Sequence, residues 1–273
     1  MKKVILITGA SSGIGKVTAL QLIKEGHIVY GAARRLNNMN DLLNAGGKSL
    51  QLDITDPKQI QLVVSQVIEE QGKIDVLFNN AGYAVYGALE NVELEDAKRQ
   101  FEVNIFGLSE ITKAVLPHMR KQNSGTIINT SSMGGRIYTP LGSWYHATKH
   151  ALEGLSDCLR LELKQFKINV VVIQPGGIHT EFGDVLTDPM VKRAKNTVYE
   201  GVTNTVANAT KRMYDKPGEL SPPSVIADLV SKAVNTSKPK NRYVAGKFAK
   251  QMMFIRKYFG DNVFDKLIMN TVK

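Results

Sequence analysis

Short apolar runs alternate with helical patterns along the chain, and this alternation constrains the fold more than any other feature. The runs interpreted as strands are residues 3–8, 27–33, 48–52, 74–78, 126–130 and 168–174. Helical patterns cover residues 14–25, 57–71, 95–121 and 142–165, with a break expected near Gly107 and a bend at Pro117. Strands that are apolar throughout and alternate with helices form a parallel sheet covered on both faces. The sequence therefore predicts a single doubly wound α/β domain.

The chain changes character after Pro175. Residues 180–220 have few strand signals and are expected to form an irregular or helical insertion. This segment follows the carboxyl end of a strand, where open α/β sheets bind their ligands, so it is either a substrate lid or a surface excursion. A helix over 223–235 and a strand and tail helix within 241–273 complete the domain.

The composition favours a soluble cytoplasmic protein. The single cysteine, Cys158, excludes an internal disulfide and a thiolate metal site, and we expect it to be a small buried hydrophobic residue. No apolar stretch approaches the ~20 residues of a membrane span. The apolar run of residues 4–7 is too short for a signal peptide. The five histidines form no ligand cluster, so no metal site is predicted.

The formal charge of +10 is concentrated toward the end of the chain. Residues 241–273 hold seven Lys or Arg and two Asp, interleaved with apolar residues. That pattern is typical of a helix packed on the domain with a basic face toward solvent. Peripheral membrane contact is a weaker alternative, and nucleic-acid binding is not favoured.

The stretch "TGASSGIG" places Gly9, Gly13 and Gly15 between the first strand and the first helix. Glycines let this turn tighten and let a pyrophosphate approach the backbone, while the helix N-terminus supplies N–H donors. A dinucleotide site of the Rossmann type is therefore predicted.

Two other motifs overlap this loop. The residues from Gly9 to Gly13 match the G-x-S-x-G of a serine-hydrolase nucleophile elbow, with Ser11 as nucleophile. That alternative leaves Gly15 unexplained and needs an acid and a histidine that the sequence does not place. Ala10 and Val17 break the pattern of a phosphate-binding P-loop.

The end of the second strand indicates which dinucleotide binds. An acidic residue at this place bonds the ribose 2′-hydroxyl of NAD, whereas arginine accommodates the 2′-phosphate of NADP. Here Arg34 and Arg35 follow the strand, and the first acid is Asp41. Guanidinium groups bind phosphate bidentately and stay charged. NADP(H) is predicted, unless the two arginines are simply solvated loop residues.

The pattern Y-x-x-x-K occurs at Tyr145 and Lys149 and again at Tyr243 and Lys247, and about one such match is expected by chance. The first copy, Tyr145 and Lys149, is preceded by three further motifs in the sequence. Together with the glycine loop, "NNAG" at 79–82 and "NTSS" at 129–132, it resembles the short-chain dehydrogenase/reductase family in order and spacing across residues 3–182.

The resemblance implies a catalytic tetrad. The family's active serine lies thirteen residues before the tyrosine, which selects Ser132 over Ser131. Its asparagine corresponds to Asn104 in "FEVNIFG". The pair at Tyr243 and Lys247 has no matching serine or asparagine and is interpreted as the chance copy.

Tyr145 would act as general acid and base, although the usual tyrosine pKa of about 10 is too high for base catalysis at neutral pH. Lys149 lies one helical turn further, so its charge and that of an oxidised nicotinamide are expected to lower the pKa of Tyr145. A lowering by about three units needs about 4 kcal/mol. Ser132 would hydrogen-bond the substrate oxygen. By resemblance, Lys149 also holds the nicotinamide ribose, and Asn104 positions a water that links Lys149 to solvent.

The resemblance implies further cofactor contacts. Asp53 matches an adenine contact or is a helix N-terminal acid, and Asn80 matches a ribose contact or stabilises the sheet. Gly177 and His179 are not the residues that the family often has, and His146 and His150 are interpreted as bystanders on their helix. The expected contacts beyond the glycines, arginines and tetrad are Ser11, Ser12, Ile14, Asp53, Ile54, Asn80, Ala81, Gly82, Pro175, Gly176, Ile178 and Thr180.

Longer stretches such as "NNAGYAVYGALE" and "HATKHALEGLSDCLRLEL" are similar to the hydroxysteroid and retinol dehydrogenase-like branch. That resemblance implies a fairly apolar ketone, aldehyde or secondary alcohol as substrate and a homo-dimer or homo-tetramer as assembly. A non-catalytic dinucleotide-binding sensor or scaffold is the alternative from a different class. The side chains that could line a substrate pocket are Tyr83, Tyr138, Trp144, Phe182 and Met190.

Overall fold

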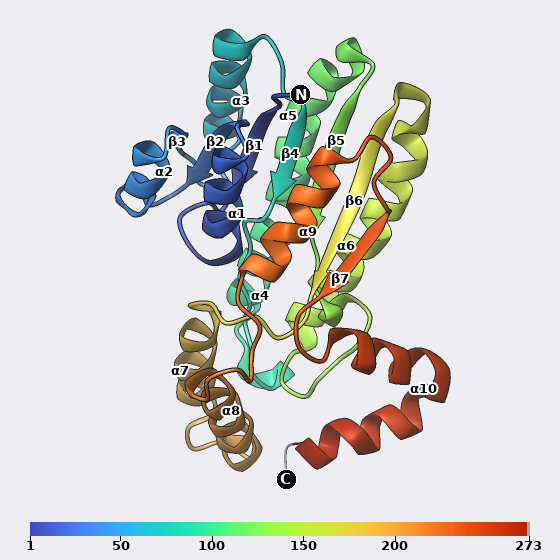
Figure 1. Cartoon of the computed structure of the whole chain (residues 1–273). Coiled ribbons are helices and arrows are strands. Elements are labelled where there is room, and N and C mark those ends of the chain that lie inside the picture. The colour runs from blue at the N-terminus through green and yellow to red at the C-terminus, as the bar shows by residue number, and fades with distance from the viewer. Residues whose placement is uncertain (272–273) are drawn as a thin grey trace.

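The computed structural model describes residues 1–271, without the side chains of Phe182, Asp184, Val185 and Thr271. Within this part, one seven-stranded sheet has the order β3-β2-β1-β4-β5-β6-β7, and every adjacent pair is parallel (Figure 1). The strands are β1 (Val4–Thr8), β2 (Ile28–Ala33), β3 (Lys48–Gln51), β4 (Val76–Asn79), β5 (Gly125–Thr130), β6 (Ile168–Pro175) and β7 (Arg242–Ala245). The predicted doubly wound α/β fold is confirmed.

Helices cover both faces of this sheet (Figure 1). Helices α1 and α9 contribute to the apolar cluster on one face, and α3, α5 and the end of α6 to the cluster on the other. The helices are α1 (Gly13–Lys24), α2 (Asn40–Asn44), α3 (Pro57–Gln71), α4 (Leu94–Phe101), α5 (Leu108–Gln122), α6 (Ser143–Leu163), α7 (Phe182–Ala194), α8 (Glu200–Asp215), α9 (Ser224–Asn235) and α10 (Ala249–Thr271).

Strand β1 shows why the apolar runs predict this arrangement. Its side chains alternate between the two clusters, with Val4 and Leu6 on one face and Ile5 and Ile7 on the other. All four are buried, because helices cover both faces. A continuous apolar run is therefore the sequence of a strand in the middle of the sheet.

The predicted break near Gly107 is a π-helical segment, Glu102–Gly107, between α4 and α5. A Cβ atom on Gly107 would lie 2.4 Å from the carbonyl oxygen of Ile54, so only glycine allows this close packing. The wider turns of a π segment change the direction in which its side chains point. Asn104 lies in the middle of this segment. Pro117 lies inside α5.

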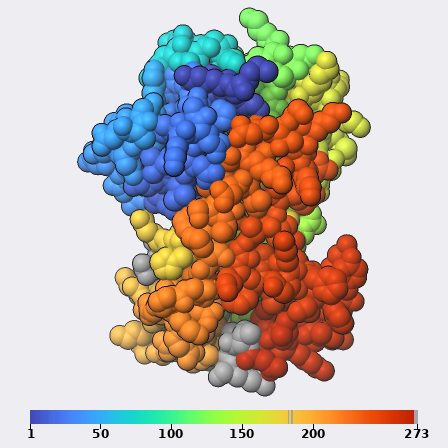
Figure 2. Space-filling model, viewed as in Figure 1, coloured from blue at the N-terminus to red at the C-terminus, as the bar shows by residue number. Residues whose placement is uncertain are grey.

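Beyond the carboxyl ends of the strands, the chain adds α7 and α8 on one side and α10 on the other (Figure 1). In the space-filling view these elements, in orange and red, form the lower part of the molecule (Figure 2). Met190 of α7 and Ala207 of α8 are buried together with Leu141. Helix α10 is broken at Gly260, where φ is 74°, and its second half buries Phe264 against Ile137.

One prediction about the core was wrong. Cys158 is exposed, because it lies on the side of α6 that faces away from the sheet. The buried positions Leu152, Ser156 and Leu163 form a stripe along the opposite side of the helix. In residues 1–271, none of the helices has the length and apolar character needed to span a bilayer.

Candidate active site

The polar and glycine-rich segments singled out in the sequence follow the carboxyl ends of the strands, which meet at one edge of the parallel sheet. The order of the strands reverses between β1 and β4, and ligands of open α/β sheets bind at such a point. The loop after β1 and the "NNAG" loop after β4 therefore lie side by side at this edge.

The glycine loop is fitted tightly against the "NNAG" loop. A Cβ atom on Gly9, whose φ is +68°, would lie 2.8 Å from the Cα of Ala81. A Cβ on Gly15 would lie 2.4 Å from the Gly9 carbonyl oxygen and 2.4 Å from Nδ2 of Asn80. Any other residue at Gly9 or Gly15 would push the two loops apart. The backbone N–H groups at the start of α1 are thus presented at the sheet edge, where a phosphate can reach them.

Asn80 and Thr8 hold these loops together. The Asn80 side-chain amide donates to the carbonyls of Thr8, at 3.3 Å, and Gly9, at 3.1 Å. The hydroxyl oxygen of Thr8 accepts hydrogen bonds from the backbone N–H groups of Asn80 and Ala81, both at 3.1 Å. Asn80 therefore supports the loop itself, and its predicted contact with the cofactor ribose stays a prediction. Sequence reasoning did not identify Thr8.

Arg34 and Arg35 are exposed directly after β2. Asp41, the first acid after them, pairs with Lys16 at 2.7 Å. The carboxylate of Asp53 accepts hydrogen bonds from Thr55 and pairs with Arg99 at 3.1 Å. Burial opposes ionisation of Asp53, but the bonds from Thr55 and the charges of Arg99 and Arg34 outweigh it and hold its pKa below the usual range. The neighbouring helix is capped by Asp56, not Asp53.

Ser132 and Tyr145 face each other across the end of β5 and the first turn of α6. Ser132 Oγ accepts a hydrogen bond from the backbone N–H of Gly134 at 2.9 Å, and the Ser132 and Tyr145 hydroxyls are also hydrogen-bonded. Burial raises the pKa of Tyr145, and the bond with Ser132 acts in the opposite direction without cancelling it.

The side chain of Lys149 is buried, with Nζ 5.9 Å from the centre of the Tyr145 ring and 2.8 Å from the Thr130 carbonyl oxygen. Burial lowers the pKa of Lys149 to about 8, against an opposing effect of Glu153. In this structure burial raises the pKa of Tyr145. The predicted lowering depends on the charge of Lys149 together with that of an oxidised nicotinamide and stays a prediction. A second positive charge at this place, such as that of oxidised nicotinamide, would act on Tyr145 in the predicted direction.

Asn104 is brought next to Lys149 by the π-helical segment. Its Oδ1 accepts from the backbone N–H of Tyr83 at 3.1 Å, and its Nδ2 donates to the Tyr83 carbonyl at 2.9 Å and to Thr148 Oγ1 at 3.2 Å. A Cβ atom on Gly82 would lie 3.1 Å from Asn104 Oδ1 and 3.9 Å from Lys149 Nζ. The side chains of Asn104 and Lys149 therefore both lie close to the backbone of Gly82.

The segment after β6 completes the edge. Thr180 lies beside the glycine loop, since a Cβ on Gly13 would lie 3.4 Å from Thr180 Cγ2. Gly176 is tightly packed, with its Cβ position 2.3 Å from the Lys247 carbonyl oxygen. Ile178 is buried in one apolar cluster, and Ile54 in the other, so these two residues can offer a ligand mainly their backbone.

The second Y-x-x-x-K pair has a different geometry. Tyr243 is buried in strand β7, and its hydroxyl oxygen accepts a hydrogen bond from the backbone N–H of Lys240 at 3.1 Å. Strand β7 ends at Ala245 and Gly246 has a φ of 95°, so this pair does not share one face of a helix. Lys247 follows the strand and cannot act on Tyr243 as a helical neighbour would.

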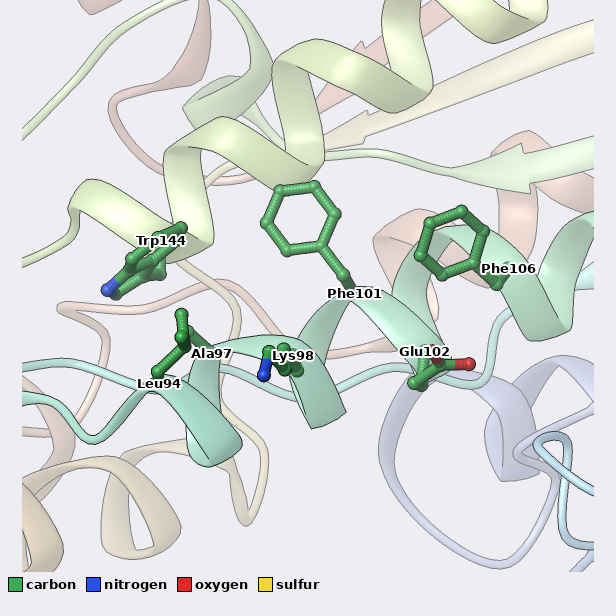
Figure 3. A pocket seen from close by; sticks show the side chains of 7 residues that line it. All are labelled: Leu94, Ala97, Lys98, Phe101, Glu102, Phe106 and Trp144. Atoms are coloured by element: carbon green, nitrogen blue, oxygen red, sulfur yellow. The ribbon is translucent and has the colours of Figure 1, made fainter.

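The residues proposed to line a substrate pocket lie in different places. Trp144 packs edge-on against Phe101 and lines an outer cavity of about 190 Å³ between α4 and α6 (Figure 3). Tyr138 donates to Asp265 of α10, and Met190 is buried between α7 and α8. Tyr83 contacts Asn104 through its backbone. The side chain of Phe182 lies outside the described residues.

Two residues near the tetrad were missed or undervalued. Tyr86 packs on Tyr145, with ring centres 5.7 Å apart. His146, interpreted as a bystander, is buried and bonded through both ring nitrogens to the segment that follows Ser132. Helical periodicity places His146 next to Tyr145, but only the path of the loop brings Gly134 and Thr139 to its ring.

Comparison with known proteins agrees with this geometry. A family model described as short chain dehydrogenase matches residues 3–191. A 3-ketodihydrosphingosine reductase of Bacteroides thetaiotaomicron is 46% identical over 183 residues, 67% of this chain and 66% of that protein. The oxidoreductase BOA17 of Botryotinia fuckeliana is 36% identical over 251 residues, 90% of this chain and 89% of that protein.

Solved structures show the same fold. A short-chain dehydrogenase from Streptomyces avermitilis aligns with a TM-score of 0.81 at 33% identity, covering 98% of this chain and 96% of that one. A serine dehydrogenase complexed with NADP+ aligns at 0.75 and 27% identity, covering 89% and 94%. A short-chain dehydrogenase from Burkholderia phymatum in complex with NAD aligns at 0.77 and 24% identity, covering 89% and 88%. The chain belongs to the short-chain dehydrogenase family, whose members are NAD(P)-dependent oxidoreductases of carbonyl and alcohol groups.

Proposed function

We propose that this protein is an NADP(H)-dependent reductase of fairly apolar ketones or aldehydes. The observation that carries the proposal is the hydrogen-bonded pair of Ser132 and Tyr145, with Lys149 buried on the next helical turn. A protein that only bound a dinucleotide would have no use for a phenol in this position. The chemistry of the pair is transfer of a proton to or from an oxygen atom.

NADPH held by the glycine loop, Arg34 and Arg35 would supply a hydride for the carbonyl carbon in the reductive direction. The Ser132 hydroxyl donates a hydrogen bond to the carbonyl oxygen and orients it toward Tyr145. That oxygen gains negative charge and takes the proton of the Tyr145 hydroxyl, which leaves a phenolate. Lys149 stabilises the phenolate by its charge, and a proton returns to Tyr145 from solvent on the side of Lys149 and Asn104. Ketone, hydride and one solvent proton thus give the alcohol.

The preference for NADP(H) rests on Arg34 and Arg35. Both are exposed at the end of β2, and Asp41, which could bond a 2′-hydroxyl, is paired with Lys16. Two guanidinium groups favour the doubly charged 2′-phosphate over a hydroxyl. Structural relatives carry either NADP+ or NAD, so the side chains at this place are the basis of the choice.

The apolar character of the substrate rests on the similarity to a 3-ketodihydrosphingosine reductase and on the hydroxysteroid- and retinol dehydrogenase-like stretches. We propose that α7 and α8 act as a lid over the substrate. Arg193 of α7 pairs with Asp96 of α4 at 2.7 Å and donates to the Tyr86 carbonyl at 3.3 Å. These contacts hold α7 beside the loop that carries Tyr86, whose ring lies against Tyr145.

The proposal is tested by fluorescence titration of the protein with NADPH and NADH, followed by turnover assays on long-chain ketones and aldehydes with the preferred cofactor. We expect tighter binding of NADPH and oxidation of NADPH only when a carbonyl compound is present. Tighter binding of NADH would overturn the choice of cofactor and leave the oxidoreductase class intact. Binding without any turnover would favour a sensor, and ester hydrolysis abolished by Ser11→Ala would favour the hydrolase.

We also propose a homo-oligomer formed through the outer cavity between α4 and α6. Leu94 and Phe106 on its rim expose 52% and 53% of their surface, next to Phe101 and Trp144 (Figure 3). Sedimentation of Phe106→Asp should show a smaller species than the unaltered protein. Leu62→Asp, an equally apolar exposed site on α3, is the control and should leave the assembly unchanged. Equal sedimentation of all three proteins would rule out this contact.

A further inference from the structure

His146 follows Tyr145 directly and is 7% exposed. Its Nδ1 lies 2.9 Å from the carbonyl oxygen of Gly134. Its Nε2 lies 3.0 Å from the backbone nitrogen of Thr139 and 3.0 Å from the Thr139 hydroxyl. One ring therefore connects the first turn of α6 to two points of the segment 133–141.

These partners determine the tautomer of the ring. A carbonyl oxygen only accepts hydrogen bonds and a backbone N–H only donates them, so Nδ1 carries the hydrogen and Nε2 accepts. Burial lowers the pKa of His146, and the bond to Gly134 opposes this effect without cancelling it. The ring is thus neutral around pH 7. The titratable groups around it are Tyr86 and Tyr145, whose rings lie 6.3 and 5.7 Å away, and His150 on the next turn of α6.

Gly134 connects His146 to the tetrad. Its carbonyl accepts from His146, and its N–H donates to Ser132 Oγ at 2.9 Å. A Cβ on Gly134 would lie 3.0 Å from His146 Nδ1 and 3.2 Å from Tyr145 Cε1. The ring is thus packed directly against the short turn that orients the Ser132 hydroxyl.

We propose that His146 is a positioning residue, which fixes the turn at Gly134 and thereby holds the Ser132 hydroxyl at the correct distance and angle from Tyr145. The inference rests on the proposed function, because positioning of Ser132 matters only if Ser132 acts on a substrate oxygen. Tyr145 is fixed by the helix. Ser132, in contrast, has an extended backbone and is followed by a three-residue 3₁₀ turn, Met133–Gly135. Without the ring, that turn loses its hydrogen bond to the residue that follows Tyr145.

Three substitutions separate the two bonds of the ring. In His146→Asn the carboxamide nitrogen falls near the place of Nδ1 and can still donate to Gly134. In His146→Gln the longer side chain reaches the place of Nε2 and can still accept from Thr139. His146→Leu removes both bonds and keeps an apolar side chain of similar size. His150→Leu is the matched control, an exposed histidine one turn further along α6.

We expect His146→Leu to lower kcat about 10- to 100-fold with an unchanged Kd for NADPH, as for loss of orientation at a reacting group. His146→Asn should recover most of kcat, His146→Gln should stay low, and His150→Leu should match the unaltered protein. On the acidic side, protonation of Nε2 would oppose the Thr139 N–H, so kcat should fall in the histidine protein and not in the Asn variant. Circular dichroism and NADPH binding check that each variant is folded.

If folded Asn and Leu variants lose kcat equally, or if the Leu variant keeps kcat within twofold, the proposal is overturned. A measurement independent of turnover separates this failure from that of the proposed function. Imidazole ¹⁵N chemical shifts should show a neutral ring with hydrogen on Nδ1 at pH 7. Hydrogen on Nε2, or a charged ring at pH 7, would contradict the positioning role whatever the substrate is.

Discussion

The ammonium nitrogen of Lys149 lies 2.8 Å from the carbonyl oxygen of Thr130, and this contact joins α6 to the end of strand β5. Two residues after Thr130 comes Ser132, and four residues before Lys149 comes Tyr145. Together with the bonds of His146 to Gly134 and Thr139, this contact joins the two segments that carry the proposed proton transfer.

The buried ammonium group of Lys149 should make stability depend on pH. Its pKa is about 8 in the folded protein and about 10.4 when unfolded, so the unfolded chain binds more protons between these values. Stability should therefore rise with pH across this window, by about 3 kcal/mol in total. Urea unfolding at pH 7.5 and pH 10 measures the gain. Lys149→Met is the reference, since other groups titrate in both proteins; an equal pH dependence in the two would contradict the burial of the charge.

Tyr145→Phe should lose turnover at least ~100-fold, because it removes the proton that the substrate oxygen takes. Binding of NADPH should be nearly unchanged. The matched control is Tyr243→Phe in the second Y-x-x-x-K pair, which lies in β7 and should retain kcat. Steady-state rates and cofactor titrations of both variants make the comparison. Comparable losses in the two would mean that the phenol of Tyr145 has no special role.

Two Gly→Ala substitutions, one in the glycine loop and one on the surface of α6, should have opposite effects on the protein. Gly15→Ala places a methyl group 2.4 Å from the Gly9 carbonyl and from the Asn80 amide, so the loops must separate and NADPH binding should weaken by at least about tenfold. Gly154→Ala in α6 meets nothing within 4 Å and should raise stability by up to ~1 kcal/mol. Fluorescence titration and thermal unfolding test the pair. Normal binding by Gly15→Ala would show that the loop tolerates the separation.

Replacing Arg34 and Arg35 together by alanine should weaken NADPH binding and leave NADH binding within about twofold. Each lost charge-assisted hydrogen bond is worth about 1.5–3 kcal/mol, so a loss of at least tenfold is expected for NADPH. Kd values for both cofactors are measured in the same buffer, because salt screens the exposed charges. Parallel losses for NADH and NADPH would point to a general role of the loop and not to the 2′-phosphate.

The buried carboxylate of Glu153 should be important for stability. It is 4% exposed and accepts from Gln174 at 2.9 Å, Arg136 at 3.0 Å and Arg242 at 3.0 Å. Glu153→Gln leaves two guanidinium groups facing a neutral amide, which should cost about 3 kcal/mol. Asp157→Asn removes a more exposed partner of Arg242 and should cost less than about 1 kcal/mol. Urea unfolding of both variants decides whether burial makes this difference.

The sequence predicts the sheet well because each buried strand is an uninterrupted apolar run. It predicts the members of the tetrad because their order and spacing can be recognised in the sequence without knowing how the chain folds. It does not predict the contacts between them. Lys149 bonds a backbone carbonyl and Ser132 a backbone N–H, and such groups are the same at every position of a chain.

Three further predictions show what the sequence leaves open. The sequence shows Lys149 beside Tyr145 but not the burial that raises the pKa of the phenol in this structure, so the net shift with a bound cofactor stays a prediction. Cys158 was expected to be buried from residue type alone, whereas its place on α6 turns it outward. Residues 180–220 have few strand signals and were predicted as an irregular or helical segment, and the helical alternative is the one observed in α7 and α8.

The position of β1 in the sheet also bears on how the chain folds. β1 pairs with β2 and with β4, so the first four strands of the sequence, through Asn79, form a contiguous half of the sheet. A nascent chain can complete this half, with its glycine loop, before Ser132 and Tyr145 have been synthesised. Pairing of β5 then requires closure over the long segment 80–124, and non-local parallel pairing of this kind is slow. The half of the sheet that carries the glycine loop can thus be complete before the half that carries Ser132 and Tyr145 pairs with it.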